Sequence, residues 1–275
     1  MKVFISVDME GVAGVTHVGD VLSSKGGDYQ LARKWMTDET NAAIEGAFEV
    51  GATEVVVADS HSVMCNVLPG ELHEDALLVR GSPRPGTMME GLDNSFDAAF
   101  LVGYHSRAGN PKGVLSHTYV LPVYNLRING VTVGEAGFNA AIAGGAGVPV
   151  ALVSGDDTLE AEVAEMLPWT ERVITKWAIS PYSARNLSPK ASCKRIREGA
   201  KRALERLAEM QPYVMETPVR LEVDFAEPIY PYLAADITGV ERVGERTLAC
   251  TGTDMWDVVR VWRTMINAGT GEFYV

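Results

Sequence analysis

The chain has 275 residues, of which 47% are hydrophobic and 22% charged, a composition typical of a globular protein and unlike that of a disordered chain. Its 24 basic and 36 acidic residues give a formal net charge of −12, which disfavours binding to nucleic-acid phosphates and to anionic membranes. Three widely spaced cysteines, Cys65, Cys193 and Cys250, argue against a disulfide framework and against a cysteine-rich zinc site.

The N-terminal segment MKVFISVDMEG does not have the pattern of a signal peptide. Asp8 and Glu10 come too early for the apolar stretch and the cleavage site. No run approaches the roughly 18 apolar residues that a transmembrane helix requires. We therefore expect a cytoplasmic protein.

Short apolar strands alternate with helices over the first two thirds of the chain. Strands are predicted at residues 3–9, 53–58, 77–80, 96–103 and 149–154, and helices at 28–50, 135–147 and 156–167. Leu31, Trp35, Ile44 and Phe48 are expected on the inner side of the first helix. The alternation predicts an α/β fold with three layers around a largely parallel central sheet.

The remaining segments predict a smaller second layer. Asn129-Gly130 indicates a hairpin within 118–133. Beyond residue 180 we expect a basic helix at 188–210, a half-exposed strand at 219–225 and a helix at 254–267. We therefore divide the chain into an α/β catalytic domain, 1–180, and a smaller α+β portion packed on it, 181–275. The hairpin and the basic helix are candidate assembly surfaces.

Several common catalytic signatures do not occur in the sequence. It contains no G-x-x-x-x-G-K-[ST] loop, no G-x-G-x-x-G after a strand, no H-E-x-x-H and no G-x-S-x-G. Nucleotide binding and serine-hydrolase chemistry therefore lose their usual support.

Chemically active side chains instead follow the predicted strands. Asp8 and Glu10 end the first strand, His61 follows the second, and His105 follows the strand at 96–103. Ligands of open α/β sheets gather beyond the carboxyl ends of the strands, so these residues are expected to share one rim. Glu135 opens a helix after the hairpin, and His117 precedes the next extended segment, so both could enter the same site.

Each of these residues also has a purely structural interpretation. The two N-terminal acids could be solvated turn residues, Glu135 could serve the helix dipole, and each histidine could be structural, as we expect for His17 and His73. Taken together, three carboxylates and two imidazoles exceed the three ligands usual for one catalytic zinc. They suit two metal ions that share a bridging carboxylate, with zinc favoured and manganese or cobalt left open.

The motifs resemble those of one known family. Ser6-Val7-Asp8-Met9-Glu10-Gly11 resembles the S-x-D-x-E-G signature of the binuclear zinc D-aminopeptidases. The resemblance continues through Asp59-Ser60-His61, Gly103-Tyr104-His105, Ser116-His117, Asn129-Gly130 and Gly134-Glu135. It implies two Zn²⁺ per chain, a catalytic His117, a ring-shaped homodecamer and the zinc ligands Asp8, Glu10, His61, His105 and Glu135.

The resemblance implies hydrolysis of short peptides with a free N-terminal amine, beginning with a D-amino acid. It casts His117 as a nucleophile, whereas proton transfer or oxyanion stabilisation is easier to defend, because metal-activated water already supplies a nucleophile. Two alternatives remain: another binuclear hydrolase, such as an amidase or a phosphoesterase, and a non-enzymatic peptide-binding protein. A phosphoesterase would need a cationic clamp, for which Arg107 and Lys112 are the nearby candidates.

Overall fold

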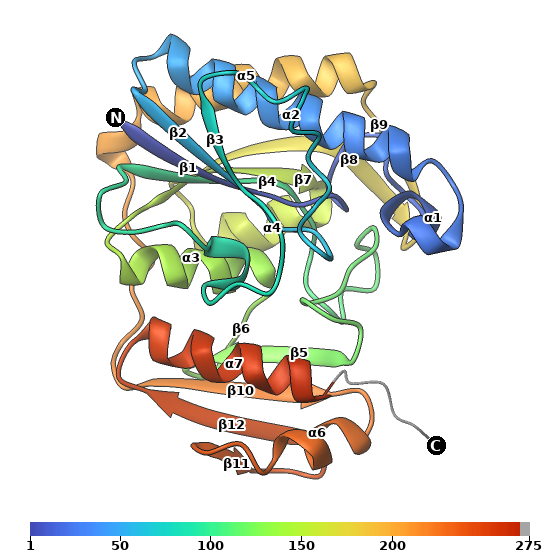
Figure 1. Cartoon of the computed structure of the whole chain (residues 1–275), viewed down its shortest axis with the longest axis vertical. Helices are drawn as coiled ribbons and strands as arrows, with labels where there is room; N and C mark the ends of the chain where they lie inside the picture. The colour runs from blue at the N-terminus through green and yellow to red at the C-terminus, as the bar shows by residue number, and fades with distance from the viewer. Residues whose placement is uncertain (270–275) are drawn as a thin grey trace.

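The computed structural model describes residues 1–269 and contains two sheets (Figure 1). The larger sheet has seven strands in the spatial order β3 (Ala76–Val79), β2 (Glu54–Asp59), β1 (Lys2–Val7), β4 (Ala98–Tyr104), β7 (Val150–Asp156), β8 (Glu171–Ser180) and β9 (Ser183–Asn186). Every neighbouring pair is parallel except β8 and β9. The predicted α/β class with a largely parallel sheet is confirmed.

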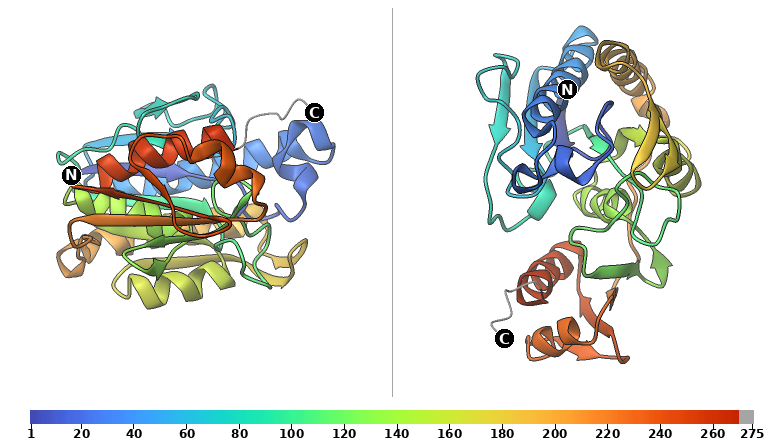
Figure 2. Two further views of the ribbon diagram at one scale, coloured as in Figure 1. Left: turned by 90° about the horizontal axis from the view of Figure 1, so that it is seen from below. Right: turned by 90° about the vertical axis from the view of Figure 1, so that its right-hand side faces the viewer.

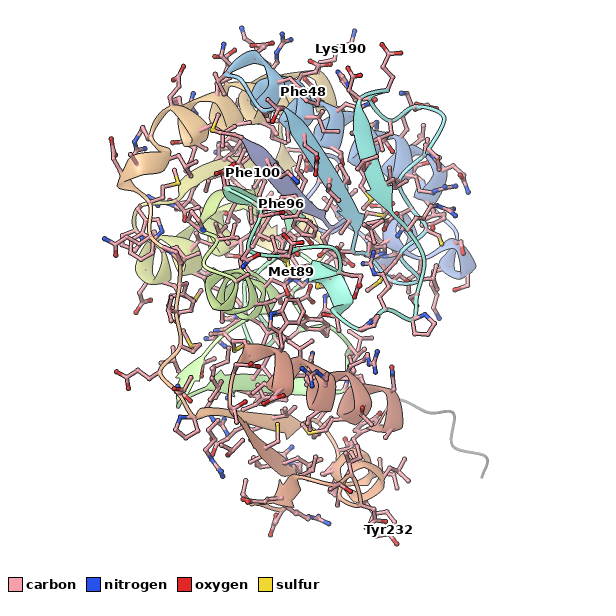
Figure 3. The ribbon with its side chains drawn as sticks, turned by 60° about the vertical axis from the view of Figure 1, so that its left-hand side comes forward. Phe48, Met89, Phe96, Phe100, Lys190 and Tyr232 are labelled. Carbon is pink, nitrogen blue, oxygen red and sulfur yellow. The ribbon has the colours of Figure 1, made fainter. Side chains whose placement is uncertain are left out.

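Helices cover both faces of this sheet. On one face, Val3, Ile5 and Phe100 pack with α2 (Tyr29–Glu49) and α5 (Pro189–Glu205). On the other face, Phe4 and Leu101 pack with α3 (Glu135–Gly145) and α4 (Asp157–Met166). Alternate residues of one strand thus feed opposite layers, as the period of a strand dictates. Figure 2 shows the sheet between the two helical layers, and Figure 3 shows Phe96, Phe100 and Met89 inside the main body.

The second sheet is antiparallel, in the order β11 (Val240–Arg242), β12 (Thr247–Gly252), β10 (Val219–Phe225), β5 (Val123–Ile128) and β6 (Val131–Thr132). Helix α7 (Met255–Gly269) covers it and joins it to α3 through one apolar cluster that includes Trp262 and Phe138. The short helices are α1 (Val18–Val21), α6 (Ile229–Ala234) and the 3₁₀ turns η1 (Ser23–Lys25), η2 (Thr87–Met89) and η3 (Leu207–Glu209).

The second sheet takes strands from both sides of residue 180. Strands β5 and β6 precede that residue, whereas β10, β11 and β12 follow it. Helix α5 also follows it, yet packs beside α2 on the larger sheet (Figure 1). The boundary at residue 180 therefore does not separate the two sheets, and the division into 1–180 and 181–275 stays a prediction.

One detail of the first long helix was predicted wrongly. Leu31 is 48% exposed, whereas Ala32, Met36 and Ile44 are fully buried. Each residue of a helix turns by about 100°, so the face that begins at Ala32 carries Leu31 away from the sheet. Within residues 1–269, no helix is both long and apolar enough to cross a membrane.

Candidate metal centre

The loop after β1 packs directly against the end of β4. The Asp8 amide donates to Val102 O (2.8 Å), and the Gly11 amide donates to Gly103 O (2.7 Å). A Cβ at residue 11 would lie 1.9 Å from Tyr104 O, and one at residue 103 would lie 2.3 Å from Asp8 O. Only glycine permits this approach, which brings the acids of one strand end beside the histidine of the next.

A buried polar network lies beneath these strand ends. Ser6 Oγ lies 2.7 Å from Ser60 Oγ and 2.6 Å from the Tyr104 hydroxyl, and it donates to Met88 O (3.0 Å). The Tyr104 hydroxyl also accepts a hydrogen bond from Asn139 Nδ2 (2.9 Å) on α3. The network ties β1, β2, β4, α3 and η2 together, which explains the serine of the S-x-D-x-E-G signature.

Asp8, Glu10 and His61 form one half of the site. His61 Nδ1 lies 3.3 Å from Asp8 Oδ1 and 3.0 Å from Glu10 Oε2. The other ring nitrogen, Nε2, lies 2.8 Å from Val21 O and donates to it. This hydrogen bond fixes the tautomer, so Nδ1 presents its lone pair to the carboxylates, as a metal-binding imidazole does.

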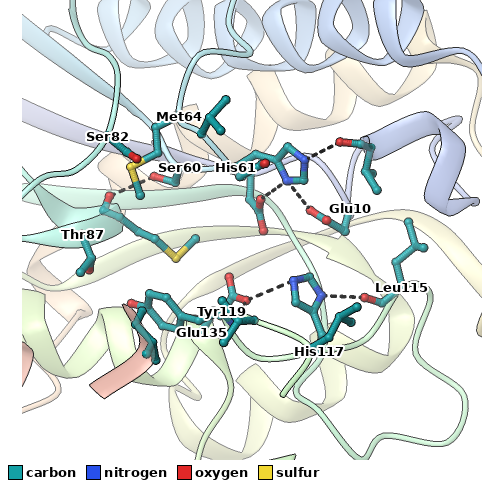
Figure 4. Close-up of a pocket in the computed structure, with 18 of the residues that line it drawn as sticks. Glu10, Ser60, His61, Met64, Ser82, Thr87, Leu115, His117, Tyr119 and Glu135 are labelled. Atoms are coloured by element: carbon teal, nitrogen blue, oxygen red, sulfur yellow. Dashed lines mark hydrogen bonds and ion pairs between the residues drawn. The ribbon is translucent and has the colours of Figure 1, made fainter. Parts of the chain in front are cut away.

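Asp8, His105 and Glu135 form the other half. His105 Nε2 lies 3.4 Å from Asp8 Oδ2 and 3.3 Å from Glu135 Oε1. His105 Nδ1 donates to Ser106 O (2.9 Å), which leaves Nε2 as the lone-pair nitrogen. The two oxygens of Asp8 thus face different histidines, which is the geometry expected of a bridging ligand. Figure 4 shows His61 with Glu10 on one side and His117 with Glu135 on the other.

His117 lies at the edge of the second half. Its ring stacks on that of His105 with centroids 4.2 Å apart and an interplanar angle of 9°. Its Nδ1 donates to Leu115 O (2.9 Å), and its Nε2 lies 3.8 Å from Glu135 Oε1. Glu135 also accepts a hydrogen bond from the Tyr119 amide (2.6 Å). His117 therefore presents a free nitrogen to the site without touching the carboxylate.

The site has polar atoms that lack partners. Asp8 Oδ2, Glu10 Oε2 and His105 Nε2 are buried and form no hydrogen bond. Buried polar atoms are nearly always satisfied. Groups of potential ligand atoms also lie within 4.8 Å of one another, in the sets Asp8, Glu10, His105 and His105, His117, Glu135. Carboxylate oxygens and imidazole nitrogens that lack partners fit divalent metal ions of the zinc type.

The electrostatics of the site also favour bound cations. Burial raises the pKa of Asp8 to about 7, and the adjacent Glu10 carboxylate contributes to that shift. Burial alone would lower the pKa of His105, but the Glu135 and Asp8 carboxylates outweigh it and raise that pKa to about 10. Burial and the neighbouring His105 lower the pKa of His117. The buried carboxylates thus compete for positive charge, which metal ions would supply.

Lys176 on β8 holds the loop that carries Glu10. Its fully buried ammonium donates to Glu10 O (2.5 Å), Val12 O (2.9 Å) and Val15 O (2.5 Å). The sequence interpretation missed both the strand and this residue. A single lysine inside the apolar segment RVITKWAI was the available signal, because lysine is almost never fully buried unless its charge is compensated.

Glu39 on α2 supports the same loop. Its Oε1 accepts hydrogen bonds from the Ala13 amide (3.0 Å) and from Ser192 Oγ (2.7 Å), while Oε2 has no partner. Burial raises the pKa of Glu39 from 4.5 to about 7. The Glu39 carboxyl therefore binds its proton more tightly in the folded protein than in the unfolded chain. Its contribution to the free energy of unfolding is fully present below pH 4.5 and is lost as the pH rises through about 7.

We expect Glu39→Gln to flatten this pH dependence. At pH 5 the variant and the wild type should have similar free energies of unfolding, whereas at pH 8 the variant should be more stable by up to about 3 kcal/mol, because one pKa unit corresponds to about 1.4 kcal/mol. Urea unfolding at both pH values measures the difference. Glu45→Gln, a change on the same helix at a partly exposed carboxylate, is the control. Parallel pH curves for wild type and Glu39→Gln would show that Glu39 is ionised in the fold.

The candidate ligands Asp8, Glu10, His61 and Glu135, with the neighbouring His117, line a cavity of about 870 Å³. Most of its wall is apolar, with Val21, Met64 and Leu121 among the lining residues. Arg107 and Lys112, the candidates for a phosphoesterase clamp, are not among the described residues that line it. The two arginines that do line it are Arg84 and Arg263, which the sequence interpretation did not single out.

Backbone strain concentrates around the same cavity. Asn129, in the hairpin turn, is one of the described non-glycine residues with positive φ. The five others all line the cavity: Ser62, Met64, Thr87, Leu115 and Tyr119. Strained residues gather at functional sites, where the surrounding fold holds them. This distribution points to the cavity independently of the metal cluster.

Comparisons with known proteins point to one family of peptidases. Residues 1–264 match the model of the peptidase family M55, described as D-aminopeptidase. A D-aminopeptidase of Bacillus subtilis (strain 168) is 36% identical over 266 residues, which cover 96% of each chain. The solved structure of the zinc-dependent D-aminopeptidase DppA from Bacillus subtilis, a self-compartmentalizing protease, superposes with a TM-score of 0.96 at 35% identity and covers 100% of both chains.

Proposed function

The chain belongs to the M55 family of D-aminopeptidases, and from this membership we propose that it hydrolyses short peptides with a free N-terminal amine and a D-amino acid in first position. The main support for the proposal is a set of buried ligand atoms on Asp8, Glu10 and His105 that have no hydrogen-bond partner. These residues follow the neighbouring strands β1 and β4, where the order of the strands reverses direction and ligands of such sheets bind. A protein that only bound peptides would have no need for this ligand set.

Two zinc ions per chain account best for the ligand geometry. Asp8, Glu10 and His61 would hold one ion, and Asp8, His105 and Glu135 the other, with Asp8 shared between them. Zinc, when bound, polarises a carbonyl group and lowers the pKa of a coordinated water towards about 7. The structurally similar DppA is zinc-dependent, which supports this metal over manganese or cobalt.

His117 would supply the part of the reaction that the metal ions do not. Its Nδ1 is held by Leu115 O, so its Nε2 is free to transfer a proton or to stabilise an oxyanion at the scissile carbonyl. The apolar wall of the cavity excludes water from the rest of the peptide. The acidic cluster also attracts the ammonium of the substrate, which favours binding of the peptide by its N-terminal end.

We also propose a homo-oligomer, a decameric ring, in the cytoplasm. The hairpin of β5 and β6 lies at an edge of the second sheet and exposes Tyr124 and Val131. Exposed apolar side chains along an unpaired strand are typical of surfaces that pair with another chain. The self-compartmentalizing character of DppA supports an assembly of this kind. Sedimentation of the purified protein, with a mass of ten chains expected, tests the stoichiometry.

The decisive experiment combines metal analysis with matched substrates. Purified protein should contain two zinc ions per chain and should cleave D-alanyl-p-nitroanilide faster than its L-isomer. Preference for the L-isomer would overturn the proposed stereochemistry. Absence of both metal and turnover would overturn the enzymatic proposal.

A further inference from the structure

Two buried donors without partners lie in the cavity away from the proposed metal ligands. Arg84 and Thr87 are 7% and 5% exposed, and both line the cavity. Arg84 Nε and Thr87 Oγ1 are buried atoms without a hydrogen-bond partner. The Tyr119 phenol lies close to the Thr87 hydroxyl and donates its own proton to Asn139 Oδ1 (2.8 Å), so its oxygen can accept the Thr87 proton. The Arg84 N–H is therefore available to an oxygen-bearing ligand, and the Thr87 hydroxyl can rotate to donate to the same ligand.

The guanidinium of Arg84 has no direct ion-pair partner. Its other two nitrogens donate to the neutral carbonyls Val79 O (3.1 Å) and Asp59 O (2.7 Å). Among residues 1–269 no carboxylate lies within ion-pair distance of it, although the Asp59 and Glu90 carboxylates attract its charge from farther away. A buried charge without a directly bonded counterion is costly. Arg84 Nε thus lacks a bonded anionic partner.

The 84–87 turn is fastened beside the metal cluster. Arg84 bonds the carbonyl of Asp59, two residues before His61, and Ser60 Oγ donates to Met88 O (3.0 Å). Figure 4 shows Thr87 at one end of the cavity and His61 with Glu10 at the other. Thr87 has φ 53°, an unusual value for a β-branched residue, so the fold holds its hydroxyl in place.

We propose that Arg84 and Thr87 bind the C-terminal carboxylate of a short peptide whose amino end lies at the metal cluster. The inference rests on the proposed peptidase function and deepens it. A single guanidinium charge matches a single carboxylate, whereas a phosphate dianion would leave a surplus negative charge. The substrate class is therefore short peptides with a free carboxyl end, in preference to peptide amides, esters and longer chains.

The test compares D-alanylglycine with D-alanylglycinamide, which differ only in the terminal carboxylate. Wild type should show a KM at least about tenfold lower for the acid, since hydrogen bonds to charged groups contribute on this scale. Arg84→Met should raise the KM for the acid at least about tenfold and should change kcat and the KM for the amide less than about twofold. Thr87→Val should give a smaller loss of the same kind, and Thr87→Ser should restore the preference.

A turnover-independent measurement accompanies the kinetics. Calorimetry should show acetylglycine, which carries the carboxylate but no amine, binding to wild type and binding at least about tenfold more weakly to Arg84→Met. Arg263→Met, at the other arginine of the cavity, should leave the acid-to-amide ratio within about twofold.

The possible outcomes distinguish a failure of the carboxylate subsite from a failure of the peptidase function. Turnover of acid and amide with the same KM, or loss of the preference in Arg263→Met instead of Arg84→Met, would overturn the carboxylate subsite and leave the peptidase function standing. Turnover of neither substrate would overturn the peptidase function, and acetylglycine binding would still decide the subsite. Should Arg84→Met fail to fold, an unchanged acid-to-amide ratio in Thr87→Val would overturn the assignment.

Discussion

Asp8→Asn is expected to lower kcat/KM by at least about a thousandfold and to reduce the zinc content below two ions per chain. One oxygen of Asp8 lies 3.3 Å from His61 Nδ1 and the other lies 3.4 Å from His105 Nε2, so both halves of the cluster share this carboxylate. Asparagine keeps the shape but removes the charge and offers one oxygen instead of two. A thousandfold loss corresponds to about 4 kcal/mol of transition-state stabilisation, which is reasonable for a disrupted metal pair.

Metal analysis and steady-state kinetics on the same preparation measure both effects. Asp97→Asn is the matched control, because Asp97 is exposed at the opposite end of the sheet, where it accepts a hydrogen bond from the Lys2 amide. The control should keep its zinc and its activity. An Asp8→Asn variant with two zinc ions and near-normal activity would show that Asp8 is not a bridging ligand.

Much of the fold could be predicted because its central strands are buried on both faces. Segments such as 53–58 and 149–154 are continuous apolar runs, which are typical of parallel strands with helices packed on both faces of the sheet. Strands β8 and β9 escaped prediction since ERVITKWAIS and SARN mix apolar with polar residues without a clear period, and β9 is the exposed edge of the sheet. Strands β11 and β12 escaped for a related reason: β11 has only three residues and pairs with β12, and β12 is specified by pairing with distant β10 rather than by a local pattern.

The candidate site could be predicted for those residues that directly follow the ends of parallel strands. Asp8, His61 and His105 each come directly after, or within two residues of, a parallel strand end, so the topology alone brings them together. Asp8 and Glu10 were predicted to end the first strand, but that strand ends at Val7 in the structure. A turn held by Gly11 and Lys176 brings Glu10 to His61 instead.

Arg84 and Thr87 could not be found from the sequence. Arg84 lies in the irregular segment between β3 and η2, and Thr87 is the first residue of η2, so no period or spacing marks either as a buried residue. Their significance depends on which of their donor atoms remain unpartnered, and that is decided by tertiary contacts with Asp59 and Val79. No local sequence pattern indicates which buried donor atoms lack a hydrogen-bond partner.

His117→Gln is expected to lower kcat by about 10²–10⁴-fold, with little change in KM and two zinc ions retained. The structure gives two reasons to separate His117 from the ligands. Its Nε2 lies 3.8 Å from Glu135 Oε1, farther than the 3.3 Å of His105 Nε2, and its ring is 21% exposed where that of His105 is 1% exposed. Glutamine preserves polarity and approximate size but cannot exchange a proton near neutral pH.

Zinc content separates a catalytic His117 from a ligand, because His117 lies close enough to His105 and Glu135 to join a metal site. Loss of one zinc ion in His117→Gln would make His117 a ligand. The control is His73→Gln, because the ring of His73 packs against Phe48 and is not among the residues that line the cavity. Intact-mass measurement of wild type during turnover then distinguishes the two catalytic roles. Transfer of a proton leaves the mass of the chain unchanged, whereas a nucleophilic His117 would carry an added acyl group. Since a metal-activated water would already supply the nucleophile, we expect no adduct.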